Sequence, residues 1–167
     1  MALSNVQTLC ALQVKETVTV TTGATVEKPV KLPNQWTPTE WSDGSGAASV
    51  NLAWTDTRSY TTSGTTLDLS GLSAAATNTG AAAFTAVKVL RIKNNDPTNT
   101  LVVGNAASAQ FAGPLSSATT TFTIPAGGEL MLVNPSAGGW TTTSANNLKI
   151  AAGASTVSAT VSILGLS

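Results

Sequence analysis

Residues 84–93 read FTAVKVLRIK and are followed by NNDP at residues 94–97, and this stretch decides the fold class. Valine and isoleucine suit the pleated surface of a β-strand. Apolar residues fall on both alternating faces in the middle of the run, which is typical of a central strand covered on both sides. The Asn-Asn-Asp-Pro ending is a strong turn signal. We therefore predict a central β-strand over residues 84–93.

Shorter segments of the same kind lie on either side of this strand. Residues 48–54 alternate between apolar and small or polar side chains with a period of two, and residues 72–83 predict a loop with at most one helical turn. Turn signals recur about every 8–12 residues, which favours a single antiparallel β-sandwich or a barrel. The predicted strands cover residues 13–20, 48–54, 64–69, 84–93, 100–103, 119–124, 129–133, 140–143, 148–150 and 157–163.

The N-terminal part differs in composition from the remainder. Prolines at positions 29, 33 and 38 remove backbone donors, so this stretch is unsuited to a central strand. We expect residues 1–46 to form a strand followed by an extended arm or loop, and residues 47–167 to form the sandwich. Trp36 and Trp41 in this arm could anchor it on its own domain or contact a partner, because tryptophan is enriched at binding hot spots. The sequence leaves both interpretations open.

Charge is scarce. The net charge is zero and charged residues make up 10 % of the chain, against about 25 % in an ordinary soluble domain. Between residues 97 and 167 only Glu129 and Lys149 carry an ionisable side chain. Interface cores are depleted in charge because few ions must then lose their water. A soluble domain with a hydroxyl-rich surface would show the same composition, so this alternative stays open as well.

The chain lacks the residues on which most catalytic mechanisms depend. The chain has no histidine and one cysteine, Cys10, which excludes histidine-based nucleophile pairs, histidine metal sites and cysteine clusters for zinc. Glu40 and Asp43 beside Trp41 could describe a sugar site, but acids of a solvated loop are the favoured explanation. Asp56 and Arg58 would share one face of a strand, where they could form an ion pair. We predict a non-enzyme with no catalytic residue, cofactor or metal.

Nucleic acid and membranes are not expected partners. The one basic cluster consists of Lys88, Arg91 and Lys93, and in a regular strand Lys88 would face away from the other two, which argues against a basic footprint for nucleic acid. No run approaches the ~20 apolar residues that span a bilayer. The first residues lack the basic and apolar regions of a secretory signal, so we expect synthesis in a cytoplasm.

The motifs after residue 49 resemble a loose family of small all-β virion proteins of tailed bacteriophages. The shared stretches are AWTDTR at 53–58, LDLSG at 67–71, VKVLRIKN at 87–94, LVVG at 101–104 and IPAGG at 124–128. The resemblance implies a jelly-roll-like sandwich in a phage particle, and it brings no catalytic residues.

These observations together predict a virion structural protein, specifically a capsid decoration or cement subunit on the phage head. Its expected partners are the major capsid protein and further copies of itself, and Trp36, Trp41 and Trp54 are the candidate interface residues. One alternative is a tail, neck or fibre component, although the chain shows no repeats or heptads. The other is a carbohydrate-binding β-sandwich that stacks sugars on Trp36, Trp41 or Trp140.

Overall fold

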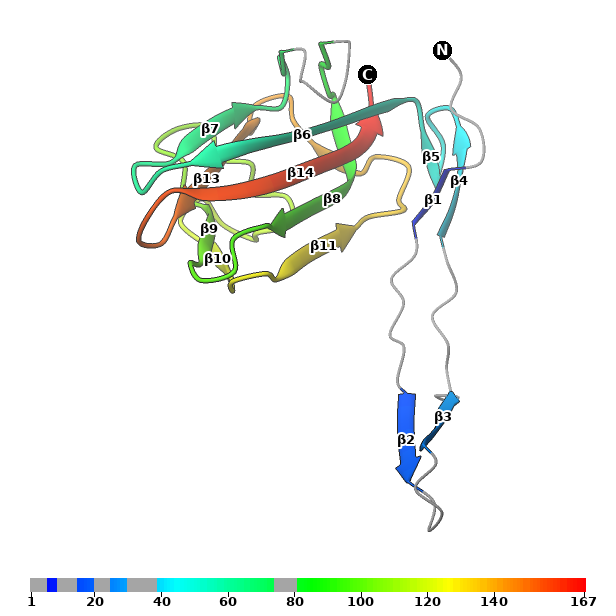
Figure 1. Ribbon diagram of the computed structural model, residues 1–167. Helices are drawn as coiled ribbons and strands as arrows, with labels where there is room; N and C mark the ends of the chain where they lie inside the picture. Colours follow the sequence, from blue (N-terminus) through cyan, green and yellow to red (C-terminus); the bar gives the residue numbers. More distant parts are fainter. Residues whose placement is uncertain (1–5, 9–14, 20–24, 30–38, 74–80) are drawn as a thin grey trace.

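The protein is all-β, as the sequence predicts. The computed structural model describes residues 6–8, 15–19, 25–29, 39–73 and 81–167, with side-chain packing from residue 41 onward. Every regular element in these residues is a β-strand (Figure 1). None of the described residues forms a helix that could cross a membrane.

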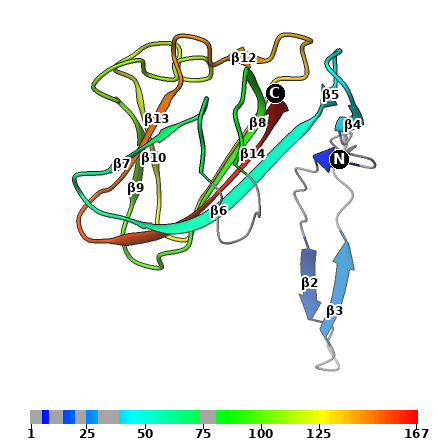
Figure 2. The same cartoon turned by 90° about the horizontal axis from the view of Figure 1, so that it is seen from above.

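Two antiparallel sheets form the sandwich (Figure 2). The larger sheet contains, in spatial order, β11 (Glu129–Val133), β8 (Ala86–Asn94), β14 (Val157–Leu166) and β6 (Leu52–Tyr60), with β12 (Trp140–Thr141) paired to the start of β8. The smaller sheet contains β10 (Thr121–Ile124), β9 (Leu101–Gly104), β13 (Asn147–Ala152) and β7 (Thr65–Asp68). The chain passes back and forth between the sheets in the order of an eight-stranded jelly roll, so the predicted fold class is confirmed.

The core lies between these two sheets, and β8 and β14 run through its middle. In β14, Val157, Ala159, Val161 and Ile163 are buried and alternate with exposed or half-exposed residues. Strand β8 is buried along most of its length and lies between β11 and β14. The central strand predicted at residues 84–93 is therefore confirmed. Removal of these apolar side chains from water is the main force that holds the sheets together.

Strand β8 contains one irregularity that matters for the site. Leu164 of β14 pairs with Val89, whereas the next residue, Gly165, pairs with Val87, so Lys88 is an extra residue in β8. Such a β-bulge interrupts the alternation of side chains along a strand. The expectation that Lys88 faces away from Arg91 and Lys93 assumed a regular strand, and the bulge removes that assumption.

A small third sheet lies against the larger sheet of the sandwich. It contains β1 (Val6–Thr8), β4 (Thr39–Asp43) and β5 (Ser49–Val50), and β4 pairs in parallel with β5. Trp41 and Val50 from this sheet pack on Val89 of β8, with Met131 and Leu164 beside them. Strands β4 and β5 of this small sheet lie on either side of residue 46, which is the predicted end of the arm.

The remaining two strands, β2 (Lys15–Thr19) and β3 (Thr25–Pro29), form a hairpin of their own. The first strand predicted from sequence, at residues 13–20, is found as β2 in its described part. The loop predicted at residues 72–83 is closed by an antiparallel bridge between Leu72 and Ala82. Its middle, residues 74–80, lies outside the described residues.

A buried asparagine ties the turn after β8 to the neighbouring loop, and it gives a first test of the fold. The Asn94 amide donates to Asn99 O at 2.8 Å and to Pro125 O at 3.0 Å. Asn94→Asp replaces this donor by a carboxylate that faces two carbonyl oxygens. We expect the free energy of unfolding at pH 7 to fall by about 3 kcal/mol, measured by urea denaturation.

The matched control is Asn95→Asp, because Asn95 is exposed and its side-chain amide donates to the exposed Thr160 hydroxyl at 3.0 Å. It should change stability by less than about 0.5 kcal/mol. Equal effects of the two substitutions would contradict the assigned role of Asn94.

Candidate interaction surfaces

The tryptophans predicted as interface residues are packed inside the chain wherever the structure describes them. Trp41 is 4 % exposed and lies between the small sheet and the sandwich, and Trp54 is 2 % exposed in the main core. The Trp54 indole donates to Ser73 O at 3.2 Å, and Trp36 lies outside the described residues. Neither buried ring offers a flat platform for a sugar or a partner in this conformation. An interface role for the three residues stays a prediction.

Strand β6 carries a polar cluster beside Trp54. Arg58 forms the expected ion pair with Asp56 and lies 5.7 Å from the centre of the Trp54 ring. Tyr60, next on the same face, is fully buried, and its hydroxyl has no hydrogen-bond partner within the described part of the chain. Burial raises the pKa of this phenol to about 12. The hydroxyl therefore stays protonated at neutral pH and is a poor base or nucleophile.

Lys88 is the least expected of the buried residues. It is 0 % exposed, and its ammonium donates a hydrogen bond of 2.6 Å to Gly46 O, in the turn between β4 and β5. No carboxylate of the described residues forms an ion pair with it. Desolvation lowers the pKa of this ammonium below its ordinary value. Lys88 is therefore not a solvated residue of this basic cluster, because its bulged position directs it to the turn at Gly46.

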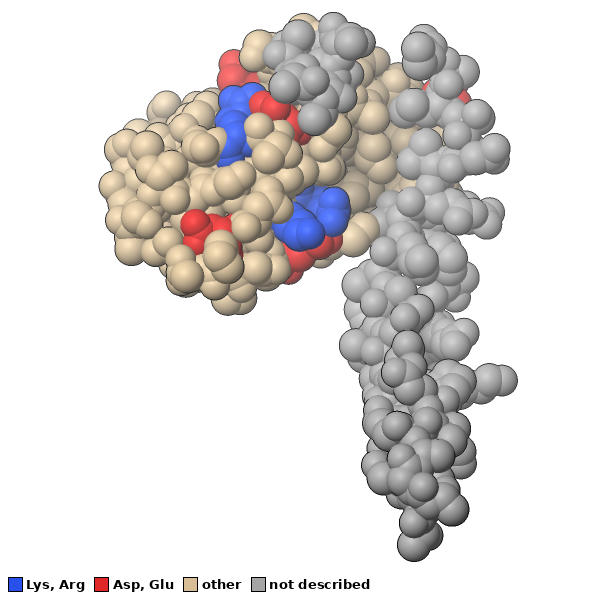
Figure 3. All heavy atoms as spheres, in the orientation of Figure 1, with Lys and Arg blue, Asp and Glu red and all other residues tan. Residues whose placement is uncertain are grey.

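On the outer face of the larger sheet, β6 and β14 carry rows of hydroxyl groups, whereas the ionisable side chains of this face lie on β8 and β11. Thr55 bonds Ser162 at 2.8 Å and Thr57 bonds Thr160 at 2.7 Å, across β6 and β14. Charged atoms form only a few small groups on the face seen in Figure 3. A partner that covers such hydroxyl rows would displace water from few ions, which keeps the desolvation cost low.

One exposed ion pair flanks these rows. Arg91 donates two hydrogen bonds to Glu129, at 2.5 and 3.0 Å, from β8 to β11. The guanidinium holds the pKa of the Glu129 carboxyl below its usual range. The single acid of β11 is thereby neutralised by its neighbour.

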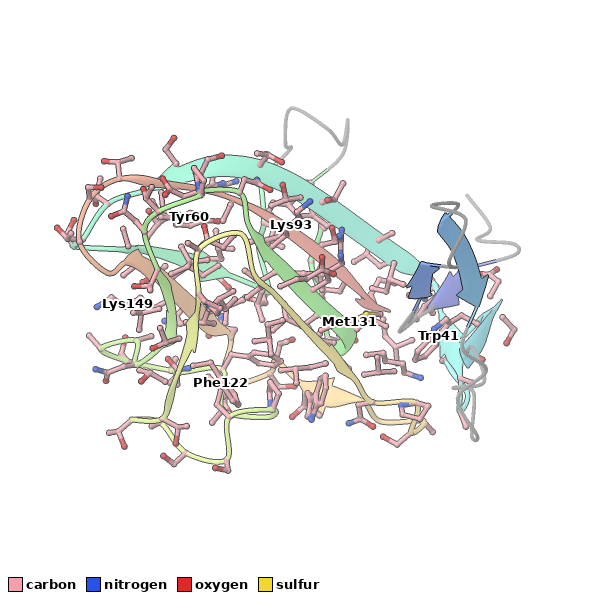
Figure 4. The ribbon with its side chains drawn as sticks, turned by 60° about the horizontal axis from the view of Figure 1, so that its bottom comes forward. Trp41, Tyr60, Lys93, Phe122, Met131 and Lys149 are labelled. Atoms are coloured by element: carbon pink, nitrogen blue, oxygen red, sulfur yellow. The ribbon has the colours of Figure 1, made fainter. Side chains whose placement is uncertain are left out.

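The two open sides of the sandwich differ in character. One side is formed by β6 and β7, and β6 carries the Asp56–Arg58 pair. The other is formed by β10 and β11, where Phe122 and Val133 are each 37 % exposed. Strand β11 reads ELMLV, and its three central side chains are half-buried. Figure 4 shows Phe122 on this side, and Met131 on β11 toward Trp41.

The backbone of β11 is open along this second side. Gly128 O accepts a hydrogen bond from Asn94 N, and Asn134 N donates to Lys88 O, so the even-numbered residues face β8. Because backbone groups alternate along an antiparallel strand, the N–H and C=O groups of Glu129, Met131 and Val133 point away from β8. No other described strand pairs with them. Unpaired edges of this kind are templates for strand addition.

The described residues do not form a candidate metal site. They contain no group of three or more histidine, cysteine, aspartate or glutamate side chains that could hold a metal ion. No protein-family model matches the chain, and neither the curated proteins nor the solved structures include a significant match. The surfaces described above are therefore the material from which a function can be inferred.

Sequence reasoning missed the open edge at β11 and the burial of Lys88. The run ELMLV predicts a strand, but nothing in it distinguishes an edge from a centre. Sheet order is set by contacts between distant segments, and the lack of a guarding lysine or proline within β11 was the only local signal. The bulge at Lys88 has no local signal at all.

Lys88 gives a test of how a buried charge without an ion-pair partner among the described residues affects stability. Lys88→Met keeps most of the length of the side chain and removes the charge, while Gly46 O lies in an exposed turn where water can replace the lost donor. We expect the free energy of unfolding at pH 7 to rise by about 1–3 kcal/mol. Chemical denaturation monitored by tryptophan fluorescence would measure it.

The pH dependence provides the control for this variant. A lysine with a lowered folded-state pKa binds fewer protons when folded than when unfolded, so its cost is full below the folded pKa and is relieved as the pH rises toward about 10.4. The difference between Lys88→Met and the wild-type protein should shrink over that range. A constant difference, or a loss of stability in the variant, would contradict the assignment.

Tyr60 gives a second test, because its hydroxyl is buried without a partner. Tyr60→Phe removes a group whose desolvation is not compensated. We expect stability to stay the same or to rise by about 1 kcal/mol, measured as a thermal unfolding midpoint. A clear loss of stability would show that the hydroxyl has a hydrogen-bond partner in solution.

Proposed function

We propose that this chain is a capsid-coating subunit of a tailed bacteriophage, a decoration or cement protein that binds the head lattice together with copies of itself. The observation that carries the proposal is the outer face of β6 and β14 in the larger sheet, where hydroxyl groups pair across the two strands and charged atoms form only a few small groups. A subunit that covers a repeated lattice needs broad surfaces that are cheap to desolvate. The resemblance of residues 49–167 to small phage virion proteins favours the same class.

Two further features support a structural role. Tyr60 and Lys88, the two chemically notable groups of the described residues, are both buried. Burial raises the pKa of the Tyr60 phenol to about 12, so it stays protonated at neutral pH. The β2–β3 hairpin and the open edge of β11 provide places at which neighbouring proteins could add strands. Such a protein would reinforce the shell through buried area rather than through a reaction.

The carbohydrate-binding alternative loses support from the described tryptophans. Trp41 and Trp54 are buried, and Trp140 is half-buried where β12 pairs with β8. A tail, neck or fibre component would use the same surfaces as a head-decoration subunit. The position of the protein in the phage particle therefore distinguishes these two functions.

The proposal is tested by gold-labelled antibody on intact particles of the phage that encodes the protein. We expect label over the whole head, because a decoration subunit occupies repeated lattice positions. Label confined to one vertex or to the tail would assign the protein to the neck, tail or fibre class instead. Absence from purified particles, with the protein present in infected cells, would end the virion proposal.

A further inference from the structure

We propose that copies of this protein join through strand addition, with the β2–β3 hairpin of one copy pairing along the open edge of β11 in the next. Two observations meet in this inference. Among the described strands, β11 has no partner on its outer side, and β2 and β3 pair only with each other.

The edge offers a defined set of groups. Glu129, Met131 and Val133 present their backbone N–H and C=O groups to the side away from β8, as the hydrogen bonds of Gly128 and Asn134 show. Natural sheet edges are usually guarded by lysine, proline, a bulge or an inward charge. Strand β11 has none of these, since its one charged residue, Glu129, is neutralised by Arg91.

The β2–β3 hairpin is not part of a larger sheet among the described strands. β2 and β3 pair only with each other among the described strands, and in both views they lie clear of the sandwich (Figures 1 and 2). A two-stranded hairpin alone is marginally stable in water, and a third strand is the usual remedy. Each strand of the hairpin has five residues, as β11 does. The outer edge of β2 could therefore cover the whole of β11, whereas β3 ends at Pro29, which has no backbone donor.

Charge does not oppose the contact. The hairpin strands carry Lys15, Glu16, Glu27 and Lys28, which sum to zero, and Glu16 lies opposite Lys28 in the register. At the edge, Arg91 and Lys93 of β8 face Glu129 of β11, which leaves one excess positive charge opposite the neutral hairpin. Neither surface would repel the other, and β-augmentation gains its affinity from main-chain hydrogen bonds that need no particular side chain.

The position of the hairpin favours a second copy as the acceptor. β1 and β4 pair with each other, and Trp41 of β4 is buried against Val89 and Met131, so the small sheet is fixed on its own sandwich. The β2–β3 hairpin lies away from the two sheets of that sandwich (Figure 1). A contact between two different patches is heterologous and closes into a ring or continues as an open chain. The proposal deepens the proposed function by naming how copies join, but it can be tested without any particle.

Cysteine cross-linking between two differently labelled samples tests the contact directly. In a Cys10→Ser background, one sample carries Val133→Cys at the edge, and the other carries Thr17→Cys in β2 or Glu27→Cys in β3. After mixing and mild oxidation, we expect disulfide-linked pairs that contain one chain of each sample. Only a contact between copies can produce them, and the hairpin strand that links faster is the one that docks.

The other results each overturn the proposal. Links between two Val133→Cys chains alone would mean that β11 edges pair with each other. A double variant, Val133→Cys with Thr17→Cys, that links only within one chain would place the hairpin on its own sheet. If sedimentation shows that the chains associate but no disulfide-linked pairs form, the chains associate through another surface. If the chains do not associate at all, the proposed contact does not exist.

A matched pair of charge variants checks the edge in the otherwise native chain. Val133→Lys introduces a guarding lysine on β11, and Ser59→Lys introduces the same charge at an exposed position of β6, the opposite edge. We expect Val133→Lys to weaken self-association at least tenfold in sedimentation equilibrium, while Ser59→Lys leaves it unchanged. Equal effects would overturn the proposal. Because neither experiment involves a phage head, self-association without head labelling would reject the proposed function alone, and head labelling without self-association would reject this contact alone.

Discussion

The pairing of β8 with β14 is the interaction on which the other parts of the molecule depend. These two strands lie side by side in the middle of the larger sheet, and their inward residues fill the core that the smaller sheet covers. β11 and β12 pair with the free side of β8, and β6 pairs with the free side of β14. A slip of one residue in the central pair would turn buried side chains of both strands to the surface, so the register of every neighbouring strand follows from this one.

The bulge within that pair explains how the N-terminal part is attached. The extra residue, Lys88, reaches Gly46 O, while Val89 beside it packs with Trp41 and Val50 of the small sheet. In a regular strand, two consecutive side chains such as Lys88 and Val89 would point to opposite faces. The bulge lets both of them contact the N-terminal part. The buried ammonium costs stability, but its single hydrogen bond specifies where the turn at Gly46 lies. The small sheet is thus fixed on the sandwich by packing and located by one directional contact.

These elements show how far the sequence could predict the structure. Period-two alternation in β14 and two-sided apolar character in β8 are local properties, and both predictions are confirmed. Phe122 and Ile124 are two residues apart and share one face of β10. Ile124 is nevertheless buried and Phe122 is 37 % exposed, because β10 is the last strand of its sheet. The bulge at Lys88, the burial of Trp41 and the open edge of β11 depend on sheet order and on contacts between distant segments. No pattern within a single strand encodes these, so the candidate surfaces could be recognised only in three dimensions.

The difference between the two sides of the sandwich follows from the scarcity of charge. A protein with few ions has few residues with which to guard its edges, and here the buried Asp56, paired with Arg58, lies on β6 whereas β11 keeps only Glu129. An unguarded edge is an aggregation hazard for a free monomer, and it is tolerated where another strand covers it. The same composition that makes the outer face cheap to desolvate therefore leaves one edge in need of a partner. Both properties suit a subunit that works as part of an array, where its neighbours supply the strands and surfaces that it lacks alone.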